Sequence, residues 1–369
     1  MSRTDRVVVG LSGGVDSAVC AYLLKAAGYE VIGVTLRTWV TPDGKDSRCC
    51  EIDDARRTAD LIGIPYYAVN CISNFKKNIT EPFISEYING RTPNPCVICN
   101  RSIKWKGLLE AADHMDAQYI ATGHYAQIVR TDSGRFTVMT AEHSEKDQTY
   151  MLYRLTQEQL SRTLMPLGKL SKSEVRRIAR HAGLPVFDKP DSQEICFVTE
   201  GSHADFIEEY YSADLPPSGD LTDLSGKTVG RHKGIYHYTV GQRKGLGISL
   251  GYPAYVTEID PVLNRVVLAD EASLYKKAVM CRDVNFMSVV EMRPGDMIKG
   301  SVKIRYHHAA CHAQAEMLAD GRLGITFEDP IRAPAKGQSA VMYDKHGCVI
   351  CGGIIDDTDQ GGTYHAYQS

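Results

Sequence analysis

The chain has 369 residues, of which 43% are hydrophobic, and its formal net charge is −3. This length is enough for two or three domains with their own cores, and the near-neutral charge gives no general indication of a nucleic-acid partner. No apolar run is long enough to cross a bilayer and the N-terminus lacks a signal-peptide core, so we expect a cytoplasmic protein without a membrane partner. In that compartment the 11 cysteines are not expected to form a structural disulfide framework.

The first 36 residues predict a strand, a glycine-rich loop, a helix and a second strand. The apolar run that starts at Val7 leads into Gly13 and Gly14, and an amphipathic helix is expected over 18–27, followed by a strand over 31–36. Units of this kind build parallel sheets. A glycine-rich loop at a helix N-terminus offers N–H groups and a positive dipole end, which suits an anion such as phosphate.

The α/β alternation continues to about residue 200. Helices are expected over 52–63, 74–89, 101–115 and 171–183, and strands over 66–70 and 117–129, the latter passing through Gly123; a hairpin is expected over 128–141. Pro93 and Pro95 are expected to exclude regular structure from 91–100.

After residue 200 the pattern changes. Residues 201–275 carry many Gly, Pro and Tyr residues, and short alternating strands with Gly turns follow from 276. We therefore expect an α/β domain with a doubly wound parallel sheet (1–200), a small central domain (201–275) and a C-terminal β-barrel (276–369). Basic residues cluster at 169–180, 230–245 and 303–308, and any one of these is more typical of a solvated face than of a binding site.

The loop S-G-G-V-D-S (12–17) matches neither G-x-x-x-x-G-K-[ST] nor G-x-G-x-x-G. Its position between the first strand and the first helix is where ligands of open α/β sheets bind. The motif S-G-G-x-D-S resembles the pyrophosphate loop (PP-loop) of the ATP pyrophosphatases, which cleave ATP to AMP and pyrophosphate while adenylating a substrate. The resemblance implies that ATP is bound by Gly10, Leu11, Ser12, Gly13, Gly14, Val15, Asp16 and Ser17. Asp16 would help to place Mg²⁺, because hard cations prefer carboxylate oxygens.

Three cysteines stand out. Cys96 and Cys99 form a C-x-x-C pair before a predicted helix, where the helix N-terminus and nearby cations favour the thiolate. Cys196 lies in a polar loop at the end of the α/β region, from which it could fold back to the same cleft. A C-x-x-C pair alone is equally consistent with a structural zinc half-site or with chance. Other cysteines are interpreted as core residues, namely Cys20, Cys71, Cys348 and Cys351.

Five motifs in order resemble those of the tRNA-specific 2-thiouridylases: S-G-G-V-D-S, P-N-P-x-x-x-C-N, A-T-G-H-Y, K-D-Q-x-Y and I-C-F-V. The resemblance extends over nearly the whole chain, including 237–248 and 302–308. It implies a PP-loop ATPase domain, a central domain and a β-barrel. The implied reaction is 2-thiolation of the wobble uridine 34 of tRNAs for Lys, Glu and Gln. ATP adenylates the C2 oxygen of a flipped-out base, and sulfur replaces that oxygen with release of AMP and pyrophosphate.

The resemblance also implies residue roles. Cys99 is the nucleophile at the target base, Cys196 carries a persulfide from an upstream sulfur-donor protein, and the two thiols end as a disulfide. The nucleotide is flanked by Leu36 and Gly123, and the target base by Asn94, Pro95 and Cys96. Contacts to the tRNA anticodon stem-loop are implied for His124, Lys146, Asp147, Gln148, Arg305, Tyr306 and Gln338.

One departure from the family changes the predicted chemistry. Many members carry Asp where this chain has Cys96, so an acid–base role at this position does not carry over. With Cys99 and Cys196 it makes three thiols, which leads to a second hypothesis for sulfur delivery. In it the three thiols hold a [4Fe–4S] cluster whose open iron binds hydrosulfide.

Two other classes of protein are consistent with part of this pattern. Another PP-loop enzyme, such as an amide-forming synthetase or a tRNA lysidine synthase, needs the loop but not Cys99 and Cys196. A non-enzymatic nucleotide- and RNA-binding module predicts no loss of function on Cys99→Ser.

Overall fold

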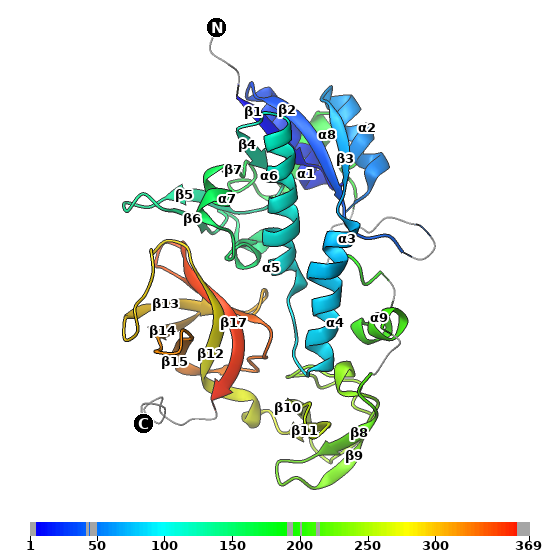
Figure 1. Cartoon of the computed structure of the whole chain (residues 1–369), viewed down its shortest axis with the longest axis vertical. Helices are drawn as coiled ribbons and strands as arrows, with labels where there is room; N and C mark the ends of the chain where they lie inside the picture. The colour runs from blue at the N-terminus through cyan, green and yellow to red at the C-terminus, as the bar shows by residue number, and fades with distance from the viewer. Residues whose placement is uncertain are drawn as a thin grey trace.

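The computed structural model describes residues 5–41, 44, 50–189, 195–199, 201–211 and 215–359. Within these residues the chain forms a five-stranded sheet, a four-stranded sheet, a closed barrel of six strands and a separate two-stranded hairpin (Figure 1). The five-stranded sheet and its helices lie at the top of the view, with the barrel and the four-stranded sheet below.

The five-stranded sheet is parallel throughout, which confirms the expected α/β class. Its order is β3-β2-β1-β4-β7. The strands are β1 (Arg6–Gly10), β2 (Glu30–Arg37), β3 (Tyr66–Asn70), β4 (Tyr119–Ala121) and β7 (Thr163–Leu164). β1 is the central strand of this order. Since α1 (Val15–Ala26) follows the C-terminal end of β1, it starts at the carboxyl edge of the sheet, where such sheets bind ligands.

Helices cover both faces of this sheet. Val7 and Val9 of β1 pack into a core with residues of three helices: α1 (Val15–Ala26), α2 (Ile52–Ile62) and α8 (Lys172–His181). Val8 packs on the opposite side, into the core that contains Leu108 of α6 (Lys106–His114). This alternation follows from the two-residue repeat of a strand, and all three valines are 0% exposed.

Two helical runs contain π-helical turns. The first joins α3 (Ile72–Phe75), the π-helical η1 (Lys76–Thr80) and α4 (Glu81–Ile88). The second joins α5 (Pro95–Cys99), the π-helical η2 (Asn100–Trp105) and α6. The expectation of no regular structure over 91–100 is therefore wrong from Pro95 onward. Proline suits the first turn of a helix, where its missing N–H would have no partner in the helix.

The strand expected over 117–129 is also wrong, because β4 ends at Ala121. A Cβ atom at Gly123 would lie 2.7 Å from Asp16 C and 2.7 Å from Ser17 N, so the chain passes against the start of α1 here instead of continuing as a strand. The chain is extended again in β5 (Gln127–Arg130), which pairs with β6 (Phe136–Met139) as the expected hairpin.

Short helical segments complete this part of the chain. They are the 3-10 turns η3 (Ser144–Lys146) and η4 (Thr149–Met151) and the helices α7 (Gln157–Ser161) and α9 (His203–Tyr210). Ser171 and Glu174 form a capping box at the start of α8.

The remaining strands form two sheets. The four-stranded sheet has the order β10-β11-β8-β9, from β8 (Gly219–Thr222), β9 (Thr228–His232), β10 (Tyr255–Asp260) and β11 (Arg265–Ala269). The expected barrel is confirmed; its order is β12-β15-β14-β13-β16-β17, closed by β17 on β12. Its strands are β12 (Tyr275–Phe286), β13 (Met297–Lys303), β14 (Cys311–Met317), β15 (Leu323–Arg332), β16 (Ser339–Tyr343) and β17 (Val349–Asp359). The residues at which the domains divide stay a prediction.

The barrel is attached to the first domain by hydrogen bonds. Thr137 of β6 donates its hydroxyl to the carbonyl of Val349 at 2.7 Å, and Arg135 donates to the carbonyls of Phe286 and Met287 at 3.0 Å each. Cys20, Cys71 and Cys351 are buried, as expected for core residues, whereas Cys348 is only half-buried. In the described part of the chain, no helix has the length and apolar character that crossing a membrane requires.

A buried hydrogen bond fixes the end of η2 to the sheet. Trp105, fully buried, donates its indole N–H to the hydroxyl of Thr163 at 2.8 Å. We predict that Thr163→Val lowers the free energy of unfolding by about 1–3 kcal/mol, because the indole N–H loses its acceptor at unchanged side-chain shape. Urea unfolding measures this. In a double-mutant cycle, Thr163→Val should cost less stability in the Trp105→Phe background, because the hydrogen bond is already absent there. Equal costs of Thr163→Val in both backgrounds would contradict a stabilising Trp105–Thr163 hydrogen bond.

Candidate active site

The loop between β1 and α1 has the geometry of an anion site. Gly13 has φ +82°, and a Cβ there would lie 2.7 Å from both the Cβ and the carbonyl oxygen of Glu51, so only glycine fits. The hydroxyls of Ser12 and Ser17 lie 3.2 Å apart, and Gly14 N–H donates to Ser12 Oγ at 3.4 Å. No side chain caps the first turn of α1. Its N–H groups and positive dipole end therefore face the loop.

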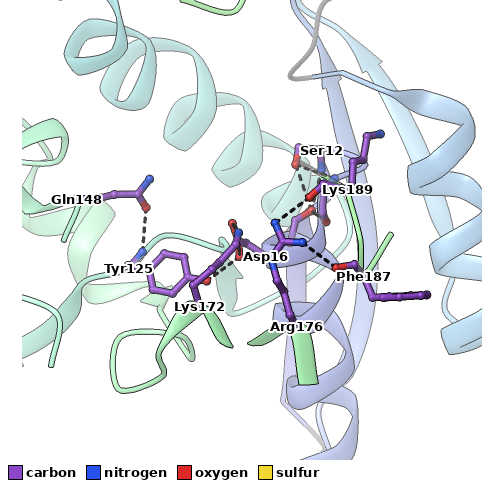
Figure 2. Close-up of polar contacts among 10 residues, drawn as sticks. Ser12, Asp16, Tyr125, Gln148, Lys172, Arg176, Phe187 and Lys189 are labelled. Atoms are coloured by element: carbon purple, nitrogen blue, oxygen red, sulfur yellow. Dashed lines mark hydrogen bonds and ion pairs between the residues drawn. The ribbon is translucent and has the colours of Figure 1, made fainter. Parts of the chain in front are cut away.

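Asp16, in the first turn of α1, connects three segments of the chain (Figure 2). Both of its carboxylate oxygens accept hydrogen bonds from Lys172 Nζ of α8 at 2.8 Å, and Oδ1 also accepts one from the Tyr125 hydroxyl at 2.7 Å. The backbone N–H of Tyr125 donates to Gln148 Oε1 at 2.9 Å, and Gln148 N–H donates back to the carbonyl of Tyr125 at 2.9 Å. The predicted nucleotide loop is thus linked to the predicted tRNA-contacting segment 146–148.

A second lysine lies against the same loop. Lys189 donates to the carbonyl of Gly13 at 3.3 Å and to Asp54 Oδ2 at 2.6 Å, and it also contacts Glu51 Oε2. Burial alone would lower the pKa of Lys189, but hydrogen bonds and charge from Asp54 and Glu51 outweigh it, so the pKa is raised. Arg176 of α8 holds this segment by donating to the carbonyls of Phe187 and Lys189 (Figure 2).

The residues predicted to flank the nucleotide have packing roles in this structure. Leu36 is 8% exposed, and a Cβ at Gly107 of α6 would lie 3.2 Å from its methyl groups. Gly123 allows close contact with the start of α1, as described above, and a Cβ at Gly10 would lie 3.1 Å from Leu108 Cδ1. Their contacts with a nucleotide stay a prediction.

The predicted thiols come from two segments that meet the same core. Cys96 and Cys99 lie inside α5, with Cys99 buried and Cys96 half-buried. Cys196 is half-buried and packs against the hydrophobic cluster that contains Cys99. Its neighbour Phe197 anchors the segment 195–199, with its ring 5.1 Å from Phe83 and 5.7 Å from Phe75.

The hypothesis of a cluster held by three thiols has a geometric requirement that this structure does not meet. Among the described residues, which include Cys96, Cys99 and Cys196, no three or more His, Cys, Asp or Glu side chains are grouped so that they could hold a metal ion. We therefore derive no step of the reaction through a cluster.

The barrel brings further predicted residues to α5. Tyr306, beyond β13, packs against the cluster that contains Cys99, and burial raises its pKa, with smaller contributions from Asp147 and Cys96. Burial also lowers the pKa of Arg305. Asp147 is 6% exposed and accepts hydrogen bonds from Ala141 N at 3.1 Å and Thr149 Oγ1 at 2.7 Å. Lys303 Nζ lies 3.6 Å from Asp147 Oδ2.

Asp147 therefore lies inside the junction between the first domain and the barrel, whereas Lys146 and Gln148 beside it are half-buried. Asn94 and Pro95 begin α5, with Asn94 half-buried and Pro95 buried. Gln338, in the turn before β16, donates to the carbonyl of Thr92 at 3.0 Å.

Sequence reasoning missed Tyr125, Lys172 and Lys189. Tyr125 lies within the A-T-G-H-Y motif and Lys172 within the basic cluster 169–180, but no pattern pairs either of them with Asp16. A contact between residues 156 positions apart, such as that of Lys172 with Asp16, leaves no periodic trace in one sequence.

The parallel sheet, the S-G-G-V-D-S loop at the start of α1 and the attached barrel define an enzyme of the PP-loop class. Three family models match the chain: "tRNA methyl transferase HUP domain" over 5–200, "tRNA methyl transferase PRC-barrel domain" over 204–270 and "Aminomethyltransferase beta-barrel domain" over 276–355.

Similar proteins include the tRNA-specific 2-thiouridylase MnmA of Lachnoclostridium phytofermentans, which is 48% identical over 94% of this chain and 98% of the relative. The tRNA-specific 2-thiouridylase MnmA 2 of Caldanaerobacter subterraneus subsp. tengcongensis is 47% identical over 96% of this chain and 99% of the relative. The chain therefore belongs to the tRNA-specific 2-thiouridylase family. Among solved structures, the U34-tRNA thiolase NcsA from Methanococcus maripaludis aligns over 56% of this chain and 62% of its own, with 22% identity and a TM-score of 0.35.

His124 is neutral in the folded protein. Its Nδ1 lies 2.9 Å from Thr122 Oγ1 and its ring lies 5.3 Å from that of Trp105; burial, followed by the charge of Lys104, lowers its pKa to about 3. In an unfolded chain the pKa of histidine is about 6.5. Between these two pKa values His124 is protonated in the unfolded chain and neutral in the folded protein, so acidification favours unfolding. The stability that the buried neutral imidazole contributes is complete above about pH 6.5 and is lost as the pH falls towards about 3.

We predict that His124→Gln flattens the loss of stability on acidification by up to about 1.4 kcal/mol per pH unit in that window. Urea unfolding from about pH 7 to about pH 4 measures the slope, with the exposed His346→Gln as the control variant. Parallel curves for wild type and His124→Gln would show that His124 does not titrate as described.

Proposed function

We propose that this chain thiolates the wobble uridine of tRNA at C2, in tRNAs for Lys, Glu and Gln, using ATP and a persulfide sulfur. The observation that carries this proposal is the combination, in one chain, of an anion-binding loop at α1 and two thiol-bearing segments packed on one core. The similarity to 2-thiouridylases, which are 48% and 47% identical to this chain over nearly its full length, supports the proposal.

The nucleotide half of the reaction uses the loop from Gly10 to Ser17. The N–H groups at the start of α1 bind the phosphates of ATP, and Lys172 moves from Asp16 to phosphate oxygens. Asp16 is of the donor type that Mg²⁺ prefers, and a bound Mg²⁺ would neutralise phosphate charge there. Adenylation converts the C2 oxygen, a poor leaving group, into one that departs with AMP.

The sulfur half uses Cys196 and Cys99. The terminal sulfur of a Cys196 persulfide, delivered by a sulfur-donor protein, attacks C2, and the oxygen leaves with AMP. In this scheme the thiolate of Cys99 acts on the adduct at the target base and not on C2 itself: it attacks the Cys196 sulfur, which releases 2-thiouridine and forms a Cys99–Cys196 disulfide. An external thiol reductant supplies the two electrons that restore both thiols.

The RNA is bound where the barrel meets the first domain. Arg305 and Tyr306 pair a cation with an aromatic ring, a combination suited to phosphate and unstacked bases. We assign the target base to Asn94, Pro95 and Cys96, and the anticodon stem-loop to His124, Lys146, Asp147, Gln148, Arg305, Tyr306 and Gln338. Tyr306 packs against the hydrophobic cluster that contains Cys99, which supports a base site near α5. A cytoplasmic location stays a prediction.

The sulfur-transfer roles can be tested by substitution. We predict that Cys99→Ser and Cys196→Ser each abolish 2-thiouridine formation while ATP binding is kept, because each removes a sulfur nucleophile and leaves the loop unchanged. Cys311→Ser, on barrel strand β14, is the control and should retain activity. Nucleoside analysis of reacted tRNA measures the product.

Mass spectrometry after incubation with a persulfide donor should place one extra sulfur on Cys196. Extra sulfur only on another cysteine would overturn the assigned roles. Stoichiometric iron in anaerobically reconstituted protein, with loss on any of the three cysteine substitutions, would favour cluster-based delivery instead. Absence of 2-thiouridine from tRNA reacted with the wild-type protein would favour another PP-loop enzyme or a binding module.

The role of Lys172 can be separated from a structural one. We predict that Lys172→Met weakens ATP binding by about tenfold to a hundredfold, the worth of a charged hydrogen bond, but changes AMP binding little. The exposed Lys169→Met is the matched control from the same segment. Calorimetric titration with ATP and AMP measures both affinities. Equal losses for the two nucleotides would show that Lys172 only maintains the fold.

A further inference from the structure

A turn of the barrel is attached to the loop that precedes α5. The turn, Lys336–Gly337–Gln338, lies between β15 and β16, and its partner is Thr92. The N–H of Thr92 donates to the carbonyl of Lys336 at 2.7 Å, and Nε2 of Gln338 donates back to the carbonyl of Thr92 at 3.0 Å. The same Nε2 lies 3.5 Å from the carbonyl of Pro93. Both backbone polar groups of Thr92 are therefore satisfied by the barrel.

Gly337 makes this approach sterically feasible. Its φ is +93°, and a Cβ atom there would lie 3.0 Å from the N, C and O atoms of Thr92. Two hydrogen bonds fix this turn to strand β17. The N–H of Gly337 donates to the carbonyl of Ile355 at 2.8 Å, and the N–H of Ile355 donates to the carbonyl of Gln338 at 2.7 Å. The turn is thus a rigid part of the barrel rather than a loose loop.

Ion pairs strengthen the same junction. Arg91, directly before Thr92, binds Asp356 of β17 at 2.8 Å. Arg282 of β12 lies 3.2 Å from the same carboxylate and 3.5 Å from Glu86 of α4. The barrel therefore contacts α4 at Glu86 and the segment before α5 at Arg91 and Thr92.

The start of α5 has no side-chain cap from its own N-cap residue, since Asn94 makes no hydrogen bond from its side chain to the first turn. Pro93 and Pro95 have fixed φ angles, so a displacement of Thr92 passes through a stiff segment to the helix that carries Cys96 and Cys99.

We propose that the Lys336–Gln338 turn positions α5, and that Gly337 and Gln338 are positioning residues for the thiol-bearing helix. The proposal rests on the function proposed above, since it assigns the chemistry to α5. It makes the barrel a structural part of the sulfur-transfer site and not only an RNA-binding attachment.

Two substitutions test the turn, each with a different defect. Gln338→Met keeps the side-chain length and removes the amide donor. Gly337→Ala places a methyl group against Thr92. Gly321→Ala is the matched control, because Gly321 also lies in a barrel turn with positive φ, +83°, but a Cβ there would meet no atom within 4 Å.

The first measurement uses no RNA. We expect Gln338→Met and Gly337→Ala to change the rate of iodoacetamide labelling of the Cys96 and Cys99 peptides by at least about threefold, while Gly321→Ala labels like wild type. The second measurement is thiolation kinetics. For Gly337→Ala, which keeps the Gln338 amide, we expect kcat to fall by about tenfold or more, as misplaced reacting groups do, with tRNA and ATP affinities within about twofold of wild type.

The outcomes separate the alternatives. Labelling like that of wild type in both Gln338→Met and Gly337→Ala would overturn the proposal, and weakened tRNA binding of Gln338→Met beside it would leave Gln338 as an RNA contact alone. Labelling changes of equal size in Gly321→Ala would assign the effect to barrel destabilisation and would also overturn it. Altered labelling in a protein whose wild type forms no 2-thiouridine would support the positioning role and refute the proposed function.

Discussion

The arrangement of the site depends on the hydrogen bonds that the carboxylate of Asp16 accepts. It lies in the first turn of α1 and is bound by Lys172 from α8 and Tyr125 from the loop after β4. Tyr125 is in turn paired by its backbone with Gln148. A charge at the phosphate end of the loop is therefore connected through a short series of hydrogen bonds to the segment assigned to RNA. An anionic ligand that binds Lys172 in place of Asp16 would leave the Asp16 carboxylate without its positive partner, at the start of this series of hydrogen bonds.

The fold could be predicted where the local pattern decides the structure. The apolar strand at Val7, the glycines at 13 and 14 and the helix after them agree in propensity, pattern and turn chemistry. The prediction failed where a distant contact decides. The strand ends at Ala121 because Gly123 lies against α1, more than a hundred residues earlier in the chain. The helix at Pro95 was missed because proline was treated as a breaker, although its position at the start of a helix is favourable.

The site shows the same limit. The motif resemblance located the thiols and the loop, and the structure packs Cys196 against the core that buries Cys99. It did not locate Lys172 or Lys189, because a salt bridge between remote segments requires the folded chain. It also gave Asp147 and Gln338 as RNA contacts without showing that Asp147 is buried among protein partners and that Gln338 holds Thr92.

The π-helical turn η2, from Asn100 to Trp105, directly follows Cys99 and precedes α6. A π-helical turn accommodates an extra residue relative to an α-helix, and each helical residue advances about 100° around the axis. Trp105 fixes the end of η2 through Thr163, and Leu108 fixes α6 against β1. The wide turn therefore takes up one residue between the thiol-bearing helix α5 and the anchored helix α6, so that each helix keeps its own packing face. Deleting one residue from η2 would tighten it into an ordinary α-helical turn rather than rotate Cys96 and Cys99 about the helix axis.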